Sequence, residues 1–232
     1  MLYSLKYNGI ISSDMQVLIK ERPDIPAPLK RYEKIEVAGR DGSLIESDGS
    51  YDDISIPVTF NYMAREDIWF EVFRNVKKWL HSEGEKELVF QDDPDYFFKV
   101  KMVEIGTNER TSLRVGNFTA TFLCDPFHYA ASGKDEIELG GSLFNHFDVS
   151  HPVYKISGNG SCNLTINNRI VTAEIEDYIV IDTDRMISYK DNIPKNTSIK
   201  GNYSDLFLVP GANDVAVSDG FIVTIIPNWR CL

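Results

Sequence analysis

The stretch that decides the fold is YEKIEVAGRDGSLIESDGSYDDISIPVTFNY, which runs from Tyr32 to Tyr62. From Ile54 to Phe60, apolar residues occupy every second position. This period of two predicts a strand with one buried face. Three glycines lie before it, at positions 39, 42 and 49, and glycine adopts positive φ at little cost. The stretch therefore predicts a β domain from which tight turns or an extended arm project.

Prolines shape the segments on both sides of this stretch. Pro57 interrupts the alternating run, which favours a sheet edge or a bulge, because proline cannot donate to a ladder. The segment Arg22–Lys30 holds prolines at positions 23, 26 and 28, which exclude a helix and favour extended chain. Short strands are expected before it, at Leu2–Tyr7 and Met15–Lys20.

One amphipathic helix is predicted near residues 65–83. Its apolar residues recur at helical spacing, and charged residues occupy the opposite face. The apolar set is Ile68, Trp69, Val72, Phe73, Val76, Trp79 and Leu80. Acidic residues come early and basic residues late, as the helix dipole favours, and Gly84 is expected to end the helix. Two tryptophans at this spacing indicate core packing rather than a ligand site.

The rest of the chain is predicted to be short strands. Glu87–Phe90, Tyr96–Ile105 and Arg114–Leu123 complete a first domain over residues 1–130. The small, polar segment AASGK at 130–134 suits a domain boundary. Residues 134–232 then show short strands separated by turns. The expected turns are Gly158–Ser161, Asn167-Asn168 and Asp219-Gly220. The fold class is therefore mainly β with one helix, and the second domain is expected to be a β-sandwich or jelly roll.

Bulk composition limits the partners. The 232 residues carry a formal net charge of −11, so specific binding to free nucleic acid is not expected. No apolar stretch is long enough to insert into a membrane, and the N-terminal residues do not resemble a secretory signal. The three cysteines at 124, 162 and 231 are odd in number and widely spaced, which fits synthesis in a reducing cytoplasm.

The search for chemistry finds little. His146 and His151 flank Asp148, but no third spaced ligand follows, so exposed loop histidines are the preferred interpretation. The aspartates at 92, 93 and 95 lack the spacing of a calcium loop and suit a turn. No nucleotide-binding motif or Gly-x-Ser-x-Gly elbow occurs. We therefore expect no catalytic residues, no metal and no cofactor, and a peptidoglycan hydrolase is poorly supported.

A sugar-binding alternative rests on aromatic side chains in the second half. Stacking of sugars on exposed rings is typical of β-sandwich modules that bind glycans. The possible platforms are Tyr178, Tyr189, Tyr203 and Trp229. Aromatic residues in strands are more often core or interface. A carbohydrate-binding module that recognises a host cell-wall saccharide is the alternative function, and it requires these rings to converge on one face.

Several motifs together resemble a known family. They are Val37-Ala38-Gly39-Arg40-Asp41-Gly42, Asp48-Gly49-Ser50-Tyr51, Ile54-Ser55-Ile56-Pro57-Val58, the helix that ends at Trp79-Leu80, Phe118-Thr119-Ala120-Thr121-Phe122, Cys124-Asp125-Pro126-Phe127, Leu208-Val209-Pro210-Gly211-Ala212-Asn213 and Pro227-Asn228-Trp229-Arg230. In this order and spacing, over nearly the whole chain, they resemble the distal tail protein of siphoviruses.

This resemblance implies a structural virion protein and not an enzyme. Family members form a homo-hexameric ring from the N-terminal domain, and their C-terminal domain is a galectin-like or carbohydrate-module-like β-sandwich. The ring is expected to join the tail tube protein to a tail-associated hub or tail-tip protein and to hold receptor-binding or baseplate proteins, while DNA passes through the hole. The implied location is the virion, at the phage tail tip, after synthesis in the cytoplasm of a bacterial host.

The glycine-rich arm, Gly39–Tyr51, suggests where subunits meet. A segment that projects from a sheet can pair with the sheet edge of a neighbour through main-chain hydrogen bonds. Head-to-tail contacts of this kind close into a ring when the rotation permits. We therefore place Arg40, Asp41, Tyr51 and Asp52 at or near a ring interface as a hypothesis. The alternative interpretation is an ordinary surface hairpin.

Overall fold

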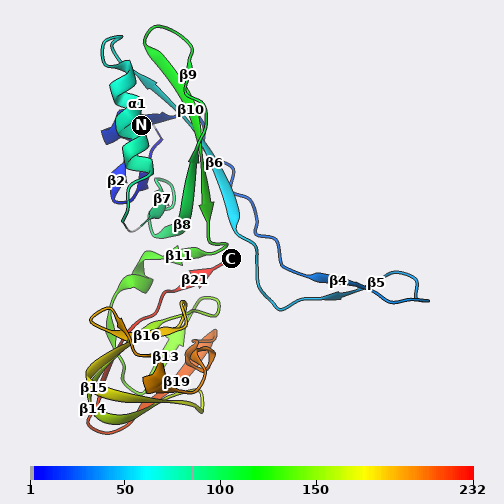
Figure 1. Cartoon of the computed structure of the whole chain (residues 1–232), viewed down its shortest axis with the longest axis vertical. Helices are drawn as coiled ribbons and strands as arrows, with labels where there is room; N and C mark the ends of the chain where they lie inside the picture. Colours follow the sequence, from blue (N-terminus) through cyan, green and yellow to red (C-terminus); the bar gives the residue numbers. More distant parts are fainter. Residues whose placement is uncertain (1–2, 85) are drawn as a thin grey trace. The chain divides into compact units, whose positions relative to one another are not determined.

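The computed structural model describes residues 3–84 and 86–232, which form several sheets and, within those residues, one α-helix (Figure 1). This confirms the predicted fold class. The chain divides into two compact units: unit 1 is Met1–His128 with Leu232, and unit 2 is Tyr129–Cys231. The domain limits expected at 1–130 and 134–232 stay predictions.

The main sheet of unit 1 is antiparallel. Its strands follow the order β2-β1-β7-β8-β10-β6-β3, and β9 pairs with β10. Their bounds are β1 Leu5–Tyr7, β2 Ile10–Ile11, β3 Leu18–Ile19, β6 Ile54–Met63, β7 Glu87–Phe90, β8 Tyr96–Ile105, β9 Glu109–Arg110 and β10 Val115–Cys124. A 3-10 turn, η1 (Ser12–Met15), joins β2 to β3. Strands β7 and β8 have the predicted bounds, and the segment 22–30 is free of helix as predicted.

Strand β6 confirms the prediction from alternation and explains its proline. It pairs with β10 along its whole length, from Ile54↔Cys124 to Met63↔Val115. On its other side, β3 pairs only with residues 60 and 61 of β6, and the Lys20 amide donates to the carbonyl of Thr59. Residues of one parity in a strand direct their N–H and C=O groups to the same edge. The missing N–H of Pro57 therefore falls at an open part of the edge, where proline is tolerated.

Helix α1, Trp69–Leu80, is shorter at both ends than the predicted helix. Residues 66–68 form a turn instead, and Ile68 donates to the Arg65 carbonyl at 3.2 Å. The C-terminal end comes at Leu80, four residues before Gly84, where the Ser82 hydroxyl donates to the Trp79 carbonyl at 2.6 Å. That hydrogen bond satisfies one of the last carbonyls of the helix and explains the earlier end.

Aromatic side chains join the helix to the sheet. The Trp79 indole donates to the Tyr7 carbonyl at 3.1 Å, and its ring lies 6.1 Å from that of Tyr7. Phe73 packs edge-on against Phe118 of β10 at 5.4 Å. Edge-to-face pairs of this kind add about 0.5–1.5 kcal/mol each beyond area burial. The two tryptophans of the helix, each 3% exposed, are thus core residues, as predicted.

Unit 2 is built on one long hairpin. Strands β14 (Val153–Ile166) and β15 (Arg169–Asp182) pair from Val153↔Asp182 to Ile166↔Arg169. The predicted turn at Asn167-Asn168 is confirmed, with φ values of 50° and 66°, the left-handed pair that a two-residue hairpin turn needs. The prediction of a turn at Gly158–Ser161 was wrong, because these residues continue β14 and pair with β15.

The remaining strands of unit 2 flank this hairpin in the order β12-β20-β14-β15-β16-β17. The strands of this sheet are β12 Ile137–Glu138, β13 Ser142–Asn145, β16 Ile187–Lys190, β17 Ile193–Pro194, β18 Ile199–Lys200, β19 Gly211–Val217 and β20 Ile222–Ile226, besides β14 and β15. Outside it, β11 (His128–Ala130) pairs with β21 (Arg230–Cys231), and the 3-10 turns are η2 Ala131–Lys134, η3 Asn196–Ser198 and η4 Tyr203–Leu206. The prediction of a hairpin at Asp219-Gly220 was wrong. Strands β19 and β20 both pair antiparallel with β14 at successive positions, so the residues between them join two strands in line.

Candidate assembly surfaces

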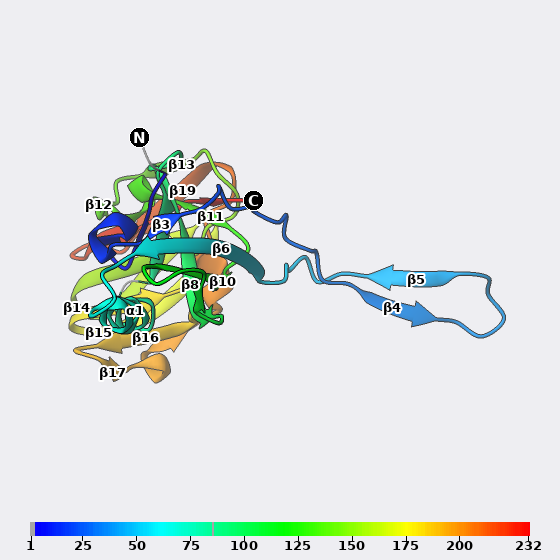
Figure 2. The same cartoon turned by 90° about the horizontal axis from the view of Figure 1, so that it is seen from above.

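The segment from Glu21 to Asp52 leaves the sheet of unit 1, and we call it the arm. Of its residues, nearly all are exposed, and none is classed as buried. Its two strands, β4 (Glu33–Glu36) and β5 (Ser43–Glu46), pair with one another in a two-stranded sheet (Figures 1 and 2). An isolated two-stranded hairpin is marginally stable in water. The arm was predicted over Gly39–Tyr51, which holds only the tip and the second strand of this longer hairpin. Both outer edges of the hairpin are unpaired within the described residues.

The base of the arm is fixed by charge and hydrogen bonds. The Arg31 Nε lies 2.6 Å from the Asp52 carboxylate, and this hydrogen bond raises the pKa of the guanidinium. Two main-chain hydrogen bonds also link the chain that enters the arm to the chain that leaves it. The Arg31 amide donates to the Ser50 carbonyl at 2.9 Å, and the Asp52 amide donates to the Leu29 carbonyl at 2.8 Å. The Ser50 hydroxyl and amide both donate to Asp48 and lower the pKa of its carboxyl.

A second anchor at the base was not visible in the sequence. Lys101 of β8 places its Nζ 2.6 Å from Asp53 and 2.9 Å from Asp125. Burial lowers the pKa of Lys101, but hydrogen bonds to both carboxylates outweigh it and raise the pKa above its ordinary value. Tyr51 packs edge-on against Phe127 at 6.0 Å. The contacts of Tyr51 and of the next residue but one, Asp53, therefore fix the base of the arm to β8 and to the segment after β10.

The four residues predicted at a ring interface lie at opposite ends of the arm. Arg40 and Asp41 lie in the turn at the tip, whereas Tyr51 and Asp52 lie at the base. The paired strands from Lys30↔Tyr51 to Glu36↔Ser43 separate them by about 20 Å at ~3.3 Å per residue. The structure does not bring these four together. Tyr51 and Asp52 fix the base of the arm to the body of unit 1, whereas Arg40 and Asp41 are exposed at its tip.

The tip needs its glycines for backbone conformation. Gly39 and Gly42 have φ values of 81° and 76°, in the left-handed region, and a Cβ on either would meet nothing within 4 Å. Residues other than glycine are strained at such φ values. The two positions therefore require glycine for its backbone conformation and not for lack of space. The turn is closed by the Arg40 amide, which donates to the Val37 carbonyl at 3.2 Å.

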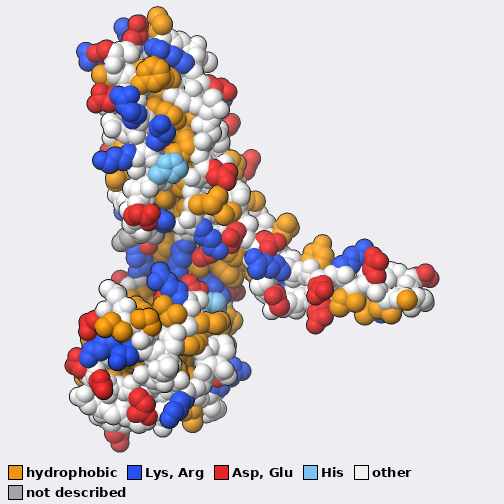
Figure 3. Space-filling model, in the orientation of Figure 1, with side chains coloured by type: hydrophobic (Ala, Val, Ile, Leu, Met, Phe, Trp, Pro, Cys, Tyr) orange, Lys and Arg blue, Asp and Glu red, His pale blue; other side chains and the backbone are white. Residues whose placement is uncertain are grey.

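Large apolar side chains along the arm are exposed. They are Ile25, Leu29, Tyr32, Val37, Leu44 and Ile45, with exposed fractions from 40% to 73%. In the space-filling view, hydrophobic side chains lie among acidic and basic ones on the arm (Figure 3). Scattered single residues of this kind are ordinary, but a run on a segment without a core of its own indicates a surface that a partner covers.

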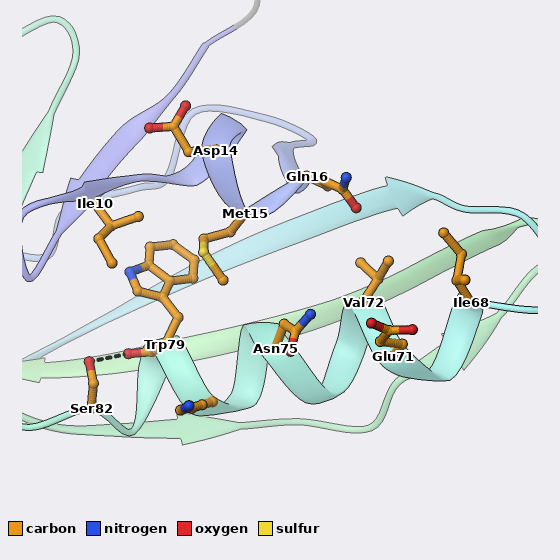
Figure 4. Close-up of a pocket in the computed structure, with 11 residues that line it drawn as sticks. Ile10, Asp14, Met15, Gln16, Ile68, Glu71, Val72, Asn75, Trp79 and Ser82 are labelled. Atoms are coloured by element: carbon orange, nitrogen blue, oxygen red, sulfur yellow. Dashed lines mark hydrogen bonds between the residues drawn. The ribbon is translucent and has the colours of Figure 1, made fainter.

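A groove on unit 1, also missed in the sequence, lies between helix α1 and the turn η1. It has a volume of about 590 Å³. Its lining comes from two segments far apart in sequence, residues 10–16 and 68–82. Figure 4 shows Ile10 and Met15 on one side and Trp79, Val72 and Ile68 of the helical segment on the other. No sequence pattern marks the groove, because Ile68, Val72 and Trp79 belong to the apolar face of the helix and residues 10–16 reach them only through the tertiary fold.

The aromatic residues predicted to stack on sugars are placed in different environments. Trp229 is 8% exposed and stacks on Phe147 at 6.0 Å. The Tyr178 ring faces the ammonium groups of Lys155 and Lys190 at 5.6 and 5.3 Å.

Tyr189 lies opposite Val180, two residues from Tyr178, and so shares its face of the sheet. The Tyr203 hydroxyl reaches Ser188, on the other face. The four rings do not form one platform.

The histidines and cysteines also lie apart. His151 contacts the Asp184 carboxylate through Nδ1 at 3.0 Å and Arg230 through Nε2 at 2.9 Å, whereas His146 is exposed beside Phe144. Within residues 3–84 and 86–232, no group of three or more His, Cys, Asp or Glu side chains could hold a metal ion. The three cysteines are free thiols. None of the helices in the described residues is both long enough and apolar enough to span a membrane.

Comparison with known proteins defines the class. Residues 5–124 match the family described as phage tail protein RIFT-related domain, and the chain belongs to this family. The match covers unit 1 from β1 to the end of β10, including the arm and helix α1.

The fold of the whole chain is similar to the crystal structure of the Dit protein (gp 19.1) of phage SPP1, a protein described as a paradigm of the hub adsorption apparatus in phages that infect Gram-positive bacteria. The TM-score is 0.71 at 15% identity, and the similarity covers 100% of both chains. A search of curated proteins found no match. The resemblance to siphovirus distal tail proteins is confirmed, and the chain is a structural component of a phage tail.

Proposed function

We propose that this chain forms a six-membered ring at the distal end of the phage tail and joins the tail tube protein to a tail-tip hub protein. The exposed arm is the observation that carries the proposal. A hairpin with no buried residue and two unpaired edges gains stability when a neighbour covers it. Repeated head-to-tail, such a contact generates a closed ring.

The remaining parts of the proposal follow from this role. DNA passes through the hole of the ring without specific binding, which suits a net charge of −11. Unit 2 holds the receptor-binding or baseplate proteins that act in adsorption. The role is structural and not enzymatic, and the chain is made in the cytoplasm of a bacterial host and located at the tail tip of the virion. Sugar binding by unit 2 is not proposed, because the four aromatic rings do not form one platform.

The test removes the arm and keeps its base. Residues 33–46 are replaced by two glycines, which leaves the Lys30↔Tyr51 bridge and the Arg31–Asp52 pair in place. Light scattering during size exclusion, over a range of concentrations, gives the mass. The wild-type chain is expected to form hexamers, alone or with a tail tube protein, and the shortened chain is expected to remain monomeric with an unchanged circular dichroism spectrum.

A matched control alters a hairpin tip in the other unit. Replacement of Asp191-Asn192, between β16 and β17, by two glycines should leave the hexamer intact. A shortened arm that still forms full rings would contradict the proposal. So would a wild-type chain that stays monomeric at every concentration, both alone and with the tube protein.

A further inference from the structure

The groove between η1 and helix α1 combines an apolar floor with charged groups on its rim. Ile10, Met15 and Trp79 approach one another across it, while Glu71 and Asp14 lie at its border (Figure 4). Its volume of about 590 Å³ falls within the ~300–1,000 Å³ of clefts that bind small ligands, enough for a few side chains. Ile10 is 40% exposed, so apolar surface remains open to a partner.

The charged side chains on the rim of the groove have no partner among the described residues of their own subunit. Among the described residues, no hydrogen bond or ion pair engages the side chains of Asp14, Glu71 or Lys78. Two of the three are acidic. Lys78 lies near the C-terminal end of helix α1, about two turns from Glu71. Figure 4 places Asp14 above Trp79 and Glu71 beside Val72, so the two carboxylates lie at different ends of the groove. Along helix α1, the exposed surface beside the groove is therefore acidic at Glu71 and basic at Lys78.

The tip of the arm has the complementary chemistry. Arg40 and Asp41 are adjacent and exposed, and neither side chain has a hydrogen bond or ion pair within the described part of the chain. Val37 and Leu44, 43% and 40% exposed, flank the turn with apolar surface. A guanidinium that meets the Glu71 carboxylate gains charge-assisted hydrogen bonds, and the adjacent Asp41 carboxylate would meet Lys78. This double complementarity also sets the direction in which the tip enters.

The groove and the tip belong to different copies of the chain. The arm of a given subunit is held at its base by Arg31–Asp52, Tyr51–Phe127 and the Lys101 contacts, and its strands run away from α1 in both views (Figures 1 and 2). A tip that cannot return to its own groove can enter that of a second copy. Because groove and tip are different surfaces, the contact is head-to-tail and repeats around a ring.

We propose that the groove lined by Ile10, Met15 and Trp79 receives the arm tip of a second copy, with Arg40 at Glu71 and Asp41 at Lys78. This inference rests on the proposed ring, because it names the surface that the arm contacts there. Apolar contact by Val37 and Leu44 with the floor supplies stabilisation, and the charges select the orientation and exclude a reversed tip.

Engineered cysteines test the placement directly. Ala38→Cys at the tip and Asn75→Cys in the groove are made in separate chains of full length, each with Cys231→Ser, and are mixed under mild oxidation. Docking brings the two Cα atoms within about 7 Å, the range that a disulfide needs. A docked tip holds the thiols at millimolar effective concentration, so the mixed disulfide should form at least about tenfold faster than with Arg74→Cys, a neighbouring helix position that does not line the groove.

Charge reversal supplies the second readout. Arg40→Glu should raise the concentration needed for half-assembly about tenfold, Glu71→Arg should do the same, and the two changes in one chain should restore assembly. Arg74→Glu, which also reverses a charge on the exposed helix surface, should leave assembly unchanged. The double variant guards against misfolding, since a chain that regains assembly is folded.

The outcomes separate this inference from the proposed ring. Rings of wild-type mass with no preference for Asn75→Cys over Arg74→Cys would overturn the groove and leave the ring standing. Failure of the double reversal to restore assembly, while both singles are folded, would also overturn it. A wild-type chain without any oligomer would overturn the ring and this inference together.

Discussion

Two hairpins in this chain have the same topology and opposite surroundings. In the arm, β4 and β5 pair over four residues each, and neither face is covered. In unit 2, β14 and β15 pair over fourteen residues each, and many side chains on one face are buried, among them Tyr154, Ile156, Leu164, Val171 and Ile181. Burial of apolar surface contributes about 25 cal/mol per Å² to folding stability. The two hairpins therefore differ in hydrophobic stabilisation, the largest favourable contribution to folding.

The difference shows what each hairpin is for. The β14–β15 hairpin is stabilised by the core of its own unit, so its residues serve the fold. The arm buries almost no apolar surface. The exposed side chains of Val37, Leu44 and Ile45 therefore contribute little to the stability of the subunit, and its fold does not explain why they are apolar. An extended, apolar hairpin edge is a liability in a monomer, and a partner that covers it removes the liability. The comparison therefore points to intermolecular contact.

The largest expected effect on the free energy of unfolding comes from replacing an isoleucine by alanine, and the same substitution is compared in both hairpins. Ile156→Ala in β14 removes a fully buried side chain and should lower the free energy of unfolding by about 2–5 kcal/mol. Ile45→Ala in the arm removes a side chain that is 69% exposed and should change it by less than about 0.5 kcal/mol. Amide hydrogen exchange of peptides from β14 and β15 measures the effect in unit 2 itself. Equal costs at the two positions would break the comparison.

Alkaline pH should destabilise the buried hairpin. Burial raises the pKa of the Tyr154 hydroxyl above its ordinary 10.0, and this hydroxyl donates to the Leu206 carbonyl at 2.7 Å. A raised pKa means that stability is complete below about pH 10 and is lost as the pH rises further, because the unfolded state then releases the proton first. The slope for one group is at most about 1.4 kcal/mol per pH unit.

The measurement follows urea unfolding from pH 8 to 11. Tyr154→Phe should reduce the alkaline slope, although it lowers stability at pH 8 by leaving the Leu206 carbonyl without its partner. Tyr32→Phe, on the exposed arm, should retain the wild-type pH dependence. If Tyr154→Phe kept the full slope, the alkaline loss would belong to other groups, such as the buried Cys162 thiol, whose pKa burial also raises.

The turn between β14 and β15 should show a smaller effect. Asn168 has a φ of 66°, where a β-branched side chain is strained, so Asn168→Val should cost about 1–2 kcal/mol. Asn168→Gly, which adopts this φ freely, is the matched control and should cost little. Thermal unfolding measures both. At the arm tip, Gly42→Val imposes the same strain, but there it should reduce ring assembly and leave the unfolding of the body unchanged. Equal costs for Val and Gly at position 168 would refute the strain argument.

Local periodicity explains what could be predicted of the fold. Helix α1 and the strands β6, β7, β8 and β10 each carry a period of 3.6 or 2 that short-range sequence displays. The Asn167-Asn168 turn was predictable for the same reason, since asparagine tolerates left-handed backbone. What failed depended on partners. Gly158–Ser161 contains two glycines and looks like a turn, yet β15 supplies hydrogen-bond partners that keep it in strand.

The candidate surfaces divide in the same way. The arm was predictable because glycines at 39, 42 and 49 interrupt two strand-like runs. The Lys101 anchor was not, because it joins Asp53 and Asp125 from a different strand and has no sequence signature. The groove was not predictable either, since residues 10–16 meet residues 68–82 only after both have packed on the sheet. The hypothesis that Arg40 and Asp41 lie at a ring interface came from the sequence, whereas no sequence pattern indicated a surface that could receive them.

Proteolytic cleavage of the arm should have the smallest effect on stability. It tests directly whether the arm and the β14–β15 hairpin differ in protection. Trypsin cleaves after Lys and Arg, and the arm exposes Lys30, Lys34 and Arg40, whereas the β14–β15 ladder must open before it can be cut. Free monomer should therefore be cut first within residues 21–52, and the nicked chain should unfold at nearly the wild-type temperature. In assembled rings the neighbour covers the tip, so cleavage after Arg40 should slow relative to a site that stays exposed on unit 2. Equal cleavage after Arg40 in monomer and ring would mean that the tip remains uncovered, and the apolar residues around it would then need another partner.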